Sequence, residues 1–245
     1  RNAIAVDMAA CGGTNSLTHL QAYAYEAGVP CTLDTWDEIS RKVPALVAVA
    51  PSGPYALYDF HRAGGVPVLM KIVREYLDES CLTVTGQPIG ENLADVPPFE
   101  SDVIRSLDNP VWKEGAKTIL RGNLAPRGAV TRHTIIENKK MLKNTFTARV
   151  FNSVEEALEA VETGKPKPIE SGDAVVVRYI GPRGGPAMPC CLGILWALKG
   201  KQIKDIAIIT DGRFSGFSSS YLAIGHICPE AQVGGPLALL QDGDR

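Results

Sequence analysis

Two short apolar runs, each followed by a glycine-rich loop, constrain the fold of this 245-residue chain more than any other feature. The first is DAVVVRYIGPRGGPAMP, from Asp173 to Pro189, and the second is KDIAIITDGRFSG, from Lys204 to Gly216. Runs of this length that are bounded by Gly, Pro and Asp predict buried strands. Since loops at strand ends often carry functional side chains, Ser215 is either a catalytic group or an ordinary serine of a polar turn.

The composition indicates a soluble, globular protein of one or two domains, because 45% of the residues are hydrophobic and 21% are charged. The formal net charge of −2 gives no basic footprint and argues against nucleic-acid binding. The apolar runs are shorter than the roughly 20 residues of a membrane span, and the first residues do not form a secretory signal. The expected compartment is therefore the cytoplasm, or the matrix of an organelle.

Both ends of the chain are expected to cut through structure. The first residue is Arg rather than Met, and the last residues follow an Asp-Gly turn signal after which a hairpin strand is expected. None of the six cysteines forms a C-x-x-C pair, so the pattern predicts neither a zinc site nor a redox motif. Most of the cysteines are expected to be small buried hydrophobic residues.

The predicted elements fall into two parts. Helical spacing dominates the first hundred residues, and helices are predicted at 15–28, 55–65 and 67–77. A further helix is predicted to start at a capping box formed by Thr35 and Glu38. Residues 83–101 are rich in Gly and Pro and form the predicted linker. Short β-type runs then follow at 103–110, 117–130, 147–151, 173–182 and 204–212. One further helix is predicted from the capping box of Ser153 and Glu156 to Gly164.

Neither glycine-rich loop contains a complete catalytic motif. The glycines and prolines of 181–189 permit a close backbone approach to a ligand, but their spacing is not G-x-G-x-x-G and no phosphate-binding helix is evident after them. No triad partner stands near Ser215, and a serine is a weak base unless a partner stabilises its oxyanion. His226 and His19 are expected to be core histidines, while His61 is expected to end a helix, where a cation suits the helix dipole.

Eight longer motifs follow one another along the chain. They are MAACGGTNSLTHL, LTVTGQPIGENLADV, LDNP, GNLAPRGAV, ARVFNSVEEALEAV, RYIGPRGGPAMP, ITDGRFSG and IGHICPEAQVGGPLALLQDGDR. In this order they resemble the motifs of the dihydroxy-acid and phosphogluconate dehydratase family, and the resemblance extends over nearly the whole chain. The second motif and the end of the last favour the branched-chain dihydroxy-acid type over the sugar-acid types.

The resemblance implies a mixed α/β fold in two domains. Residues 1–98 would be the truncated end of an N-terminal α/β domain, and residues 99–245 a C-terminal, β-barrel-like, swivelling β/β/α domain with a truncated C-terminus. The implied activity is that of a hydro-lyase, which removes water from a 2,3-dihydroxy acid to give a 2-keto acid in isoleucine, valine and coenzyme A precursor synthesis. A homodimer is the expected form of the full-length family members.

The same resemblance implies a catalytic role for Ser215. In the family, an iron–sulfur cluster acts as Lewis acid on the departing C3 hydroxyl, Mg²⁺ holds the carboxylate and the C2 hydroxyl, and a serine alkoxide removes the C2 proton. These cations stabilise the developing enolate and make the alkoxide attainable. Ser215 matches that serine, Arg213 is expected to support it electrostatically, and Arg213 and Gly216 are expected to bind substrate.

The metal ligands of the family are not matched in this chain. The cluster cysteines, magnesium aspartates and modified lysine of the family precede the MAACGGTN motif, and none of the six cysteines replaces them. Cys190 occupies the position of the glutamate that binds magnesium in the family, and a soft thiolate is a poor substitute for hard oxygen. Compared with the family, the spacing from Cys190 to ITDG is one residue shorter, and the segment FSSSY after Ser215 is one residue longer.

Two hypotheses follow from the resemblance and these departures. In the first, the chain is part of a dihydroxy-acid dehydratase and is inactive alone. In the second, it is a non-catalytic dehydratase-like domain that serves as a structural or interaction partner of another subunit. The upstream coding sequence distinguishes the two, because cluster-type cysteines and metal aspartates there would support the enzyme.

Overall fold

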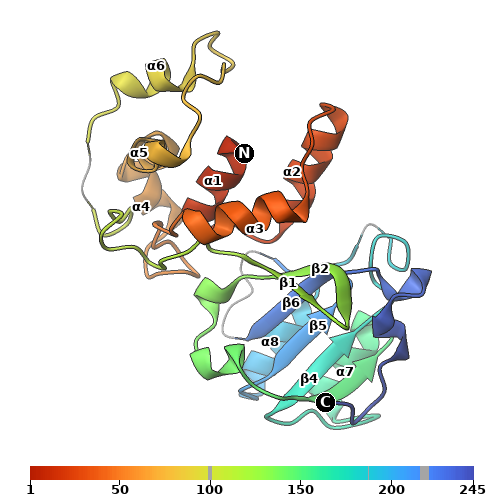
Figure 1. Cartoon of the computed structure of the whole chain (residues 1–245). Coiled ribbons are helices and arrows are strands. Elements are labelled where there is room, and N and C mark those ends of the chain that lie inside the picture. Colours follow the sequence, from red (N-terminus) through yellow and green to blue (C-terminus); the bar gives the residue numbers. More distant parts are fainter. Residues whose placement is uncertain (99–100, 187, 216–220) are drawn as a thin grey trace. The chain divides into compact units, whose positions relative to one another are not determined.

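The computed structural model describes residues 1–98, 101–186, 188–215 and 221–245. Their contacts divide the chain into two units. The first comprises Arg1–Gly12 and Ser16–Lys117, and the second comprises Gly13–Asn15 and Thr118–Arg245. The mixed α/β fold expected from the sequence is confirmed, because helices dominate the first unit and the second is built on a six-stranded sheet with helices (Figure 1).

The first unit is helical. Its helices are α1 (Asn2–Ala9), α2 (Asn15–Glu26), α3 (Leu33–Lys42), α4 (Leu57–Arg62), α5 (Gly65–Ile72) and α6 (Ile89–Ala94), with a 3-10 turn at Arg74–Tyr76. α1 packs on α3 and α5. Met8 and Trp36 are fully buried in this unit, together with Leu46 from the extended segment after α3. The helical character expected for the first hundred residues is thus confirmed.

Lys117 is the most unusual residue of the first unit, because its side chain is fully buried. Its ammonium donates to Asp7 Oδ2 at 2.5 Å, and to Gly12 O and Ser16 Oγ at 3.1 Å each. The same ammonium lies 5.8 Å from the ring centroid of Trp36. A buried ammonium is tolerated only where it is paired and hydrogen-bonded, so Asp7 is the group that makes this burial possible.

The second unit is built on six strands. They are β1 (Thr118–Gly122), β2 (Ala125–Thr131), β3 (Thr147–Phe151), β4 (Asp173–Val177), β5 (Ala207–Thr210) and β6 (Leu222–Cys228), in the sheet order β1-β2-β6-β5-β4-β3. β1, β2 and β6 pair antiparallel, whereas β6, β5, β4 and β3 pair parallel. The carboxyl ends of the four parallel strands therefore meet at one end of the sheet, where open α/β sheets usually place their sites.

Both faces of this sheet are covered. Helices α7 (Val154–Thr163) and α8 (Leu192–Gly200) cover one face, and 3-10 turns at His133–Ile135, Lys139–Leu142, Ala231–Val233 and Pro236–Leu239 lie among the segments on the other (Figure 1). β4 is buried along its whole length. Val175 and Val177 enter the core on the helical side, while Ala174 and Val176 enter the opposite core. This two-sided burial explains the uninterrupted apolar run from Ala174 to Val177.

The start of α7 agrees closely with its sequence signal. Ser153 Oγ accepts the N–H of Glu156 at 3.1 Å, and the Glu156 carboxylate accepts the N–H of Asn152 at 2.8 Å. Gly164 ends the helix in the left-handed region at φ +76°, where glycine is favoured. Ala157 is buried in the core beneath the helix.

Several local predictions are wrong. Residues 103–110 form no strand, and only an isolated bridge joins Ile104 to Val47. α3 begins at Leu33, so Thr35 lies inside the helix and forms no capping box, while Glu38 pairs with Arg1 and Lys42 instead. Residues 83–101 include α6, and the first unit continues beyond them to Lys117.

Two elements of the second unit carried too weak a signal to be predicted. α8 follows the loop 181–189, where no helix was expected. Its sequence, LGILWALKG, is apolar on nearly every side, and its N-cap residue, Cys191, provides no side-chain cap. β6 contains a glycine and a histidine within its apolar residues, which obscures the strand pattern. In both cases burial in the core outweighs weak local propensity.

Replacing Asp7 by Ala is expected to destabilise the protein by about 3–5 kcal/mol, because the Lys117 ammonium is then buried without its counter-charge. Urea unfolding followed by far-UV circular dichroism measures the loss. Asp108→Ala, at an exposed position of the same unit, is the matched control. The double variant Asp7→Ala/Lys117→Met should recover most of the loss, and a single variant as stable as wild type would contradict the assignment.

Candidate functional site

The two glycine-rich loops lie side by side at the carboxyl ends of β4 and β5. A parallel β-bridge pairs Cys190 with Arg213. The N–H of Cys191 donates to the carbonyl of Arg213 at 3.0 Å, and Arg213 Nε donates to the carbonyl of Met188 at 2.9 Å. The loop that ends at Cys190 is therefore fastened to the loop that carries Ser215, two residues beyond Arg213. The described residues of these two loops, 178–186, 188–190 and 211–215, form the candidate site.

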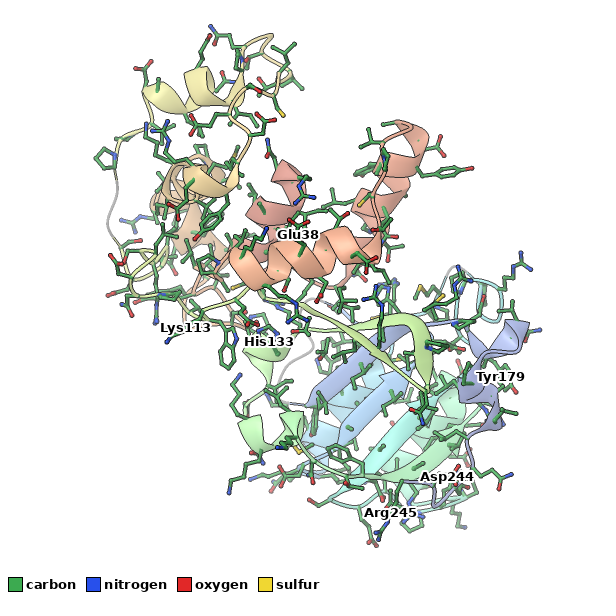
Figure 2. The ribbon with its side chains drawn as sticks, viewed as in Figure 1. Glu38, Lys113, His133, Tyr179, Asp244 and Arg245 are labelled. Carbon is green, nitrogen blue, oxygen red and sulfur yellow. The ribbon has the colours of Figure 1, made fainter. Side chains whose placement is uncertain are left out.

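Two buried carboxylates hold the backbone of these loops. Asp211, which follows β5, accepts the N–H groups of Tyr179 and Ile180 at 3.1 Å each. Tyr179, labelled in Figure 2, lies at the start of the first loop, next to Arg178. Its φ of +63° is in the left-handed region. Glu230, which follows β6, accepts the N–H groups of Arg183 and Gly184 at 2.9–3.0 Å. The chain thus uses its own anions to fix the path of the loop.

Ser215 is half-buried and lines a small cavity of about 10 Å³. Arg132, at the end of β2, lines the same cavity and is only 7% exposed. Thr14, which the contacts group with this unit, also lines it, and its buried hydroxyl has no hydrogen-bond partner among the described residues. The cavity has room for about one water molecule. Ser215 and a permanently charged arginine thus line one cavity, where positive charge favours developing negative charge on oxygen.

Arg132 is the residue that sequence reasoning missed. Arg213, which was expected to support Ser215, donates a hydrogen bond from its Nε to the Met188 carbonyl and pairs through its backbone with Cys190. Arg132 stands far from Ser215 in the sequence, directly after a strand whose partner β6 was not predicted. The available signal was an arginine that follows closely on the apolar residues Ala129 and Val130. Gly216, the other expected substrate-binding residue, lies outside the described residues.

The histidines differ in environment. His226 is half-buried within β6, and this burial together with the nearby Arg213 charge lowers its pKa to about 4. Burial and the Lys139 charge likewise lower the pKa of His133 to about 4, and His133 Nδ1 is 2.8 Å from Thr118 Oγ1 (Figure 2). The expectation of a core position is met only in part by His226, which is half-buried, and is wrong for His19, which is exposed. His61 lies in the last turn of α4, as expected.

The cysteines are less buried than the sequence indicated. All six are free thiols, but only Cys11 and Cys191 are buried, and Cys81 is exposed. Burial raises the pKa of the Cys191 thiol to about 12, so this side chain stays protonated and is a poor metal ligand. Cys190 is half-buried and is the thiol that the candidate site presents.

The described residues do not fit an iron–sulfur cluster or a complete magnesium site. Within 1–98, 101–186, 188–215 and 221–245, no three His, Cys, Asp or Glu side chains come together as metal ligands would. The two carboxylates nearest the candidate site, Asp211 and Glu230, already accept backbone N–H groups. Over the same described ranges, no helix is long and apolar enough to cross a membrane.

Comparisons with known proteins agree with the order of the sequence motifs. Residues 1–92 match the family model described as dihydroxy-acid/6-phosphogluconate dehydratase N-terminal, and residues 102–245 match the corresponding C-terminal model. The chain is 46% identical over 248 residues to a dihydroxy-acid dehydratase of Oceanobacillus iheyensis, covering 99% of this chain and 43% of that protein. It is 48% identical over 249 residues to a dihydroxy-acid dehydratase of Chloroflexus aggregans, covering 99% of this chain and 43% of that protein. The chain spans less than half the length of these curated relatives.

The lowered histidine pKa values predict a loss of stability in acid. The unfolded histidines bind protons near their ordinary pKa of 6.5, while folded His226 and His133 bind them only near 4. Their contribution to stability is therefore complete above pH 6.5 and is lost as the pH falls toward 4. The melting temperature of His226→Asn, a residue that tolerates the φ of +55°, should fall less over this range than that of wild type. Equal slopes would show that His226 titrates normally in the folded protein.

Anaerobic reconstitution with iron and sulfide is expected to leave the 245-residue chain without a stoichiometric cluster, because its described residues provide no suitable set of thiolates. Iron and sulfide analysis with visible absorption measures the outcome. A stable cluster with characteristic absorption would mean that cysteines from separate parts of the chain assemble into a site.

Proposed function

The chain belongs to the dihydroxy-acid/6-phosphogluconate dehydratase family, and on that premise we propose that it is part of a hydro-lyase that converts a 2,3-dihydroxy acid into a 2-keto acid. The branched-chain type is favoured, because the relatives described above are named dihydroxy-acid dehydratases. The observation that carries the proposal is the pairing of Cys190 with Arg213, since it joins the two loops in which the family motifs have their functional residues.

In the proposed reaction, Ser215 removes the proton from C2 of the substrate. The C3–O bond then breaks, hydroxide leaves, and the resulting enol tautomerises to the 2-keto acid. Arg132, which lines the cavity beside Ser215, favours negative charge on the serine oxygen and on the substrate. Arg213 and Gly216 remain proposed substrate-binding residues.

The iron–sulfur cluster and Mg²⁺ used in the family would supply Lewis-acid chemistry in the complete enzyme. Because the described residues do not fit either group, their ligands would come from other parts of a longer protein. Cys190 lies at the position of the family's magnesium-binding glutamate, and its thiol does not suit a hard cation. We therefore propose that the 245-residue chain is inactive alone.

A second proposal, favoured by Cys190 itself, is a non-catalytic dehydratase-like domain that acts as a structural or interaction partner. A cysteine in place of a carboxylate is the change expected where metal binding is no longer required. The two proposals differ in one measurable respect. Only the first predicts dehydration activity when the missing metal-binding half is supplied.

The finer organisation also remains a proposal. A boundary near 98/99, with an N-terminal α/β part before it and a swivelling β/β/α domain after it, is supported by the gap between the two family-model matches, 1–92 and 102–245. The contacts within the chain put the boundary between the two units at Lys117 instead, so residues 102–117 pack with the first unit. A homodimer in the cytoplasm or an organelle matrix, with a dihydroxy acid as substrate, is the corresponding form of the whole enzyme.

The test joins this chain to the upstream half of the Oceanobacillus iheyensis enzyme in one polypeptide and measures keto-acid formation from 2,3-dihydroxyisovalerate at saturating Mg²⁺. Cys190→Glu is expected to raise the rate by about a hundredfold, because it supplies a hard oxygen ligand at a position where charge develops. Ser215→Ala should abolish that gain.

Cys81→Glu, at an exposed cysteine of the first unit, is the matched control and should leave the rate unchanged. A joined protein that stays inactive with Cys190→Glu, although it holds cluster and metal, would favour the non-catalytic domain. If Cys190→Glu has no effect while Ser215→Ala still removes a measurable basal activity, the altered segment after Ser215 is the defect.

A further inference from the structure

The end of β6 and the residues that follow it contact both loops of the candidate site through their backbone and through Glu230. The N–H of His226 donates to the carbonyl of Gly212 at 2.8 Å. The N–H of Ala231 donates to Asp211 Oδ2 at 2.8 Å, and the Glu230 carboxylate accepts from Arg183 and its neighbour in the other loop. Residues 226–231 therefore connect two loops that are far apart in the sequence.

Asp211 is the second part of this connection. Its Oδ1 accepts the N–H of Ile180 and its Oδ2 accepts those of Tyr179 and Ala231, at 2.8–3.1 Å. The side chain has no solvent exposure, so these three donors replace water around a buried anion. One carboxylate thus fixes the end of β5, the start of the loop after β4 and the segment after β6.

The glycines of the first loop are explained by the same contacts. A Cβ on Gly181 would lie 2.3 Å from Glu230 Oε2, and one on Gly184 would lie 2.6 Å from the Tyr179 carbonyl oxygen. Successive N–H groups of Arg183 and Gly184 point to a single carboxylate, as N–H groups do in the concave anion sites formed by glycine-rich loops. Here the anion is Glu230 of the same chain, so the loop is shaped around an internal ligand.

We infer that Glu230 and Asp211 are positioning residues, whose carboxylates hold the loop of Cys190 against the loop of Ser215 in the geometry that the dehydration requires. The inference deepens the proposed function and rests on it. Neither carboxylate acts on the substrate directly. Each acts through the backbone N–H groups that it binds, and a displacement of about 1 Å in such loops is enough to lower a rate by about a hundredfold.

The first test does not depend on activity, because Cys190 reports on its own loop. The 245-residue chain is treated with N-ethylmaleimide, and the labelling rate of each cysteine is measured by mass spectrometry, with fragment ions that separate Cys190 from buried Cys191. Glu230→Gln keeps the shape of the side chain but only one acceptor oxygen. It should speed labelling of Cys190 by about tenfold, because loss of a charge-assisted hydrogen bond favours local opening.

Glu230→Ala should have a larger effect, and Gly181→Ala should act in the same direction without removing the carboxylate. Glu162→Gln, at an exposed position of α7, is the matched control. Labelling of Cys81, which is exposed in the first unit, should be unchanged in every variant. If the Glu230→Ala variant does not fold, the Glu230→Gln and Gly181→Ala variants still test the inference. Rates for Cys190 within about twofold of wild type in these folded variants would overturn the inference.

The second test uses the joined dehydratase that carries Cys190→Glu. Glu230→Gln is expected to lower kcat by about a hundredfold with KM changed by less than about threefold, because orientation is lost while the substrate contacts remain. If Glu230→Gln speeds labelling of Cys190 in the 245-residue chain but leaves kcat of the joined dehydratase unchanged, the positioning role is overturned. If the joined protein shows no dehydration at all, the proposed function fails, and the labelling experiment still decides whether Glu230 holds the loop.

Discussion

The candidate site depends on one interaction, the burial of the Asp211 carboxylate among three backbone N–H groups from two other segments of the chain. The parallel pairing of β4, β5 and β6 brings these segments to the same end of the sheet. Pairing alone leaves the loops beyond the strands undefined, because a loop has many accessible conformations and each ordered residue loses entropy. The buried anion selects one of these conformations, and Glu230 does the same for the rest of the first loop.

A comparable arrangement occurs within the first unit, where the Lys117 ammonium is buried against Asp7 and two further oxygen atoms. In both units a charged side chain far from the relevant segment in sequence fixes backbone that the helices and strands do not reach. Such groups add little to stability when compared with well-packed apolar residues, but removing one partner is strongly unfavourable. Their value to the fold is that they specify a single path for the chain.

Family membership and site chemistry rest on different parts of the molecule. The matches extend over both units, and they are independent of any one side chain. The proposed chemistry depends on a few residues, among them Cys190 at the proposed metal position and Arg132, which lines the same cavity as Ser215. Since thiolate and carboxylate differ in their preference for metals, a single position can separate a working enzyme from a domain of the same fold.

The sequence by itself determined the mixed α/β class, the family, the buried strands from Ala174 to Val177 and Ala207 to Thr210, and the helix that begins after Ser153. Each depends on local spacing or on ordered motifs, which can be read without knowing what lies across the chain. Tertiary structure alone decided that α8 and β6 form, that 103–110 is not a strand and that His19 is exposed. It also decided that Arg132 lines the Ser215 cavity and that Asp211 and Glu230 bind loop amides. These features depend on burial and on contacts between distant residues, whose energies exceed the weak local preferences of the segments that make them.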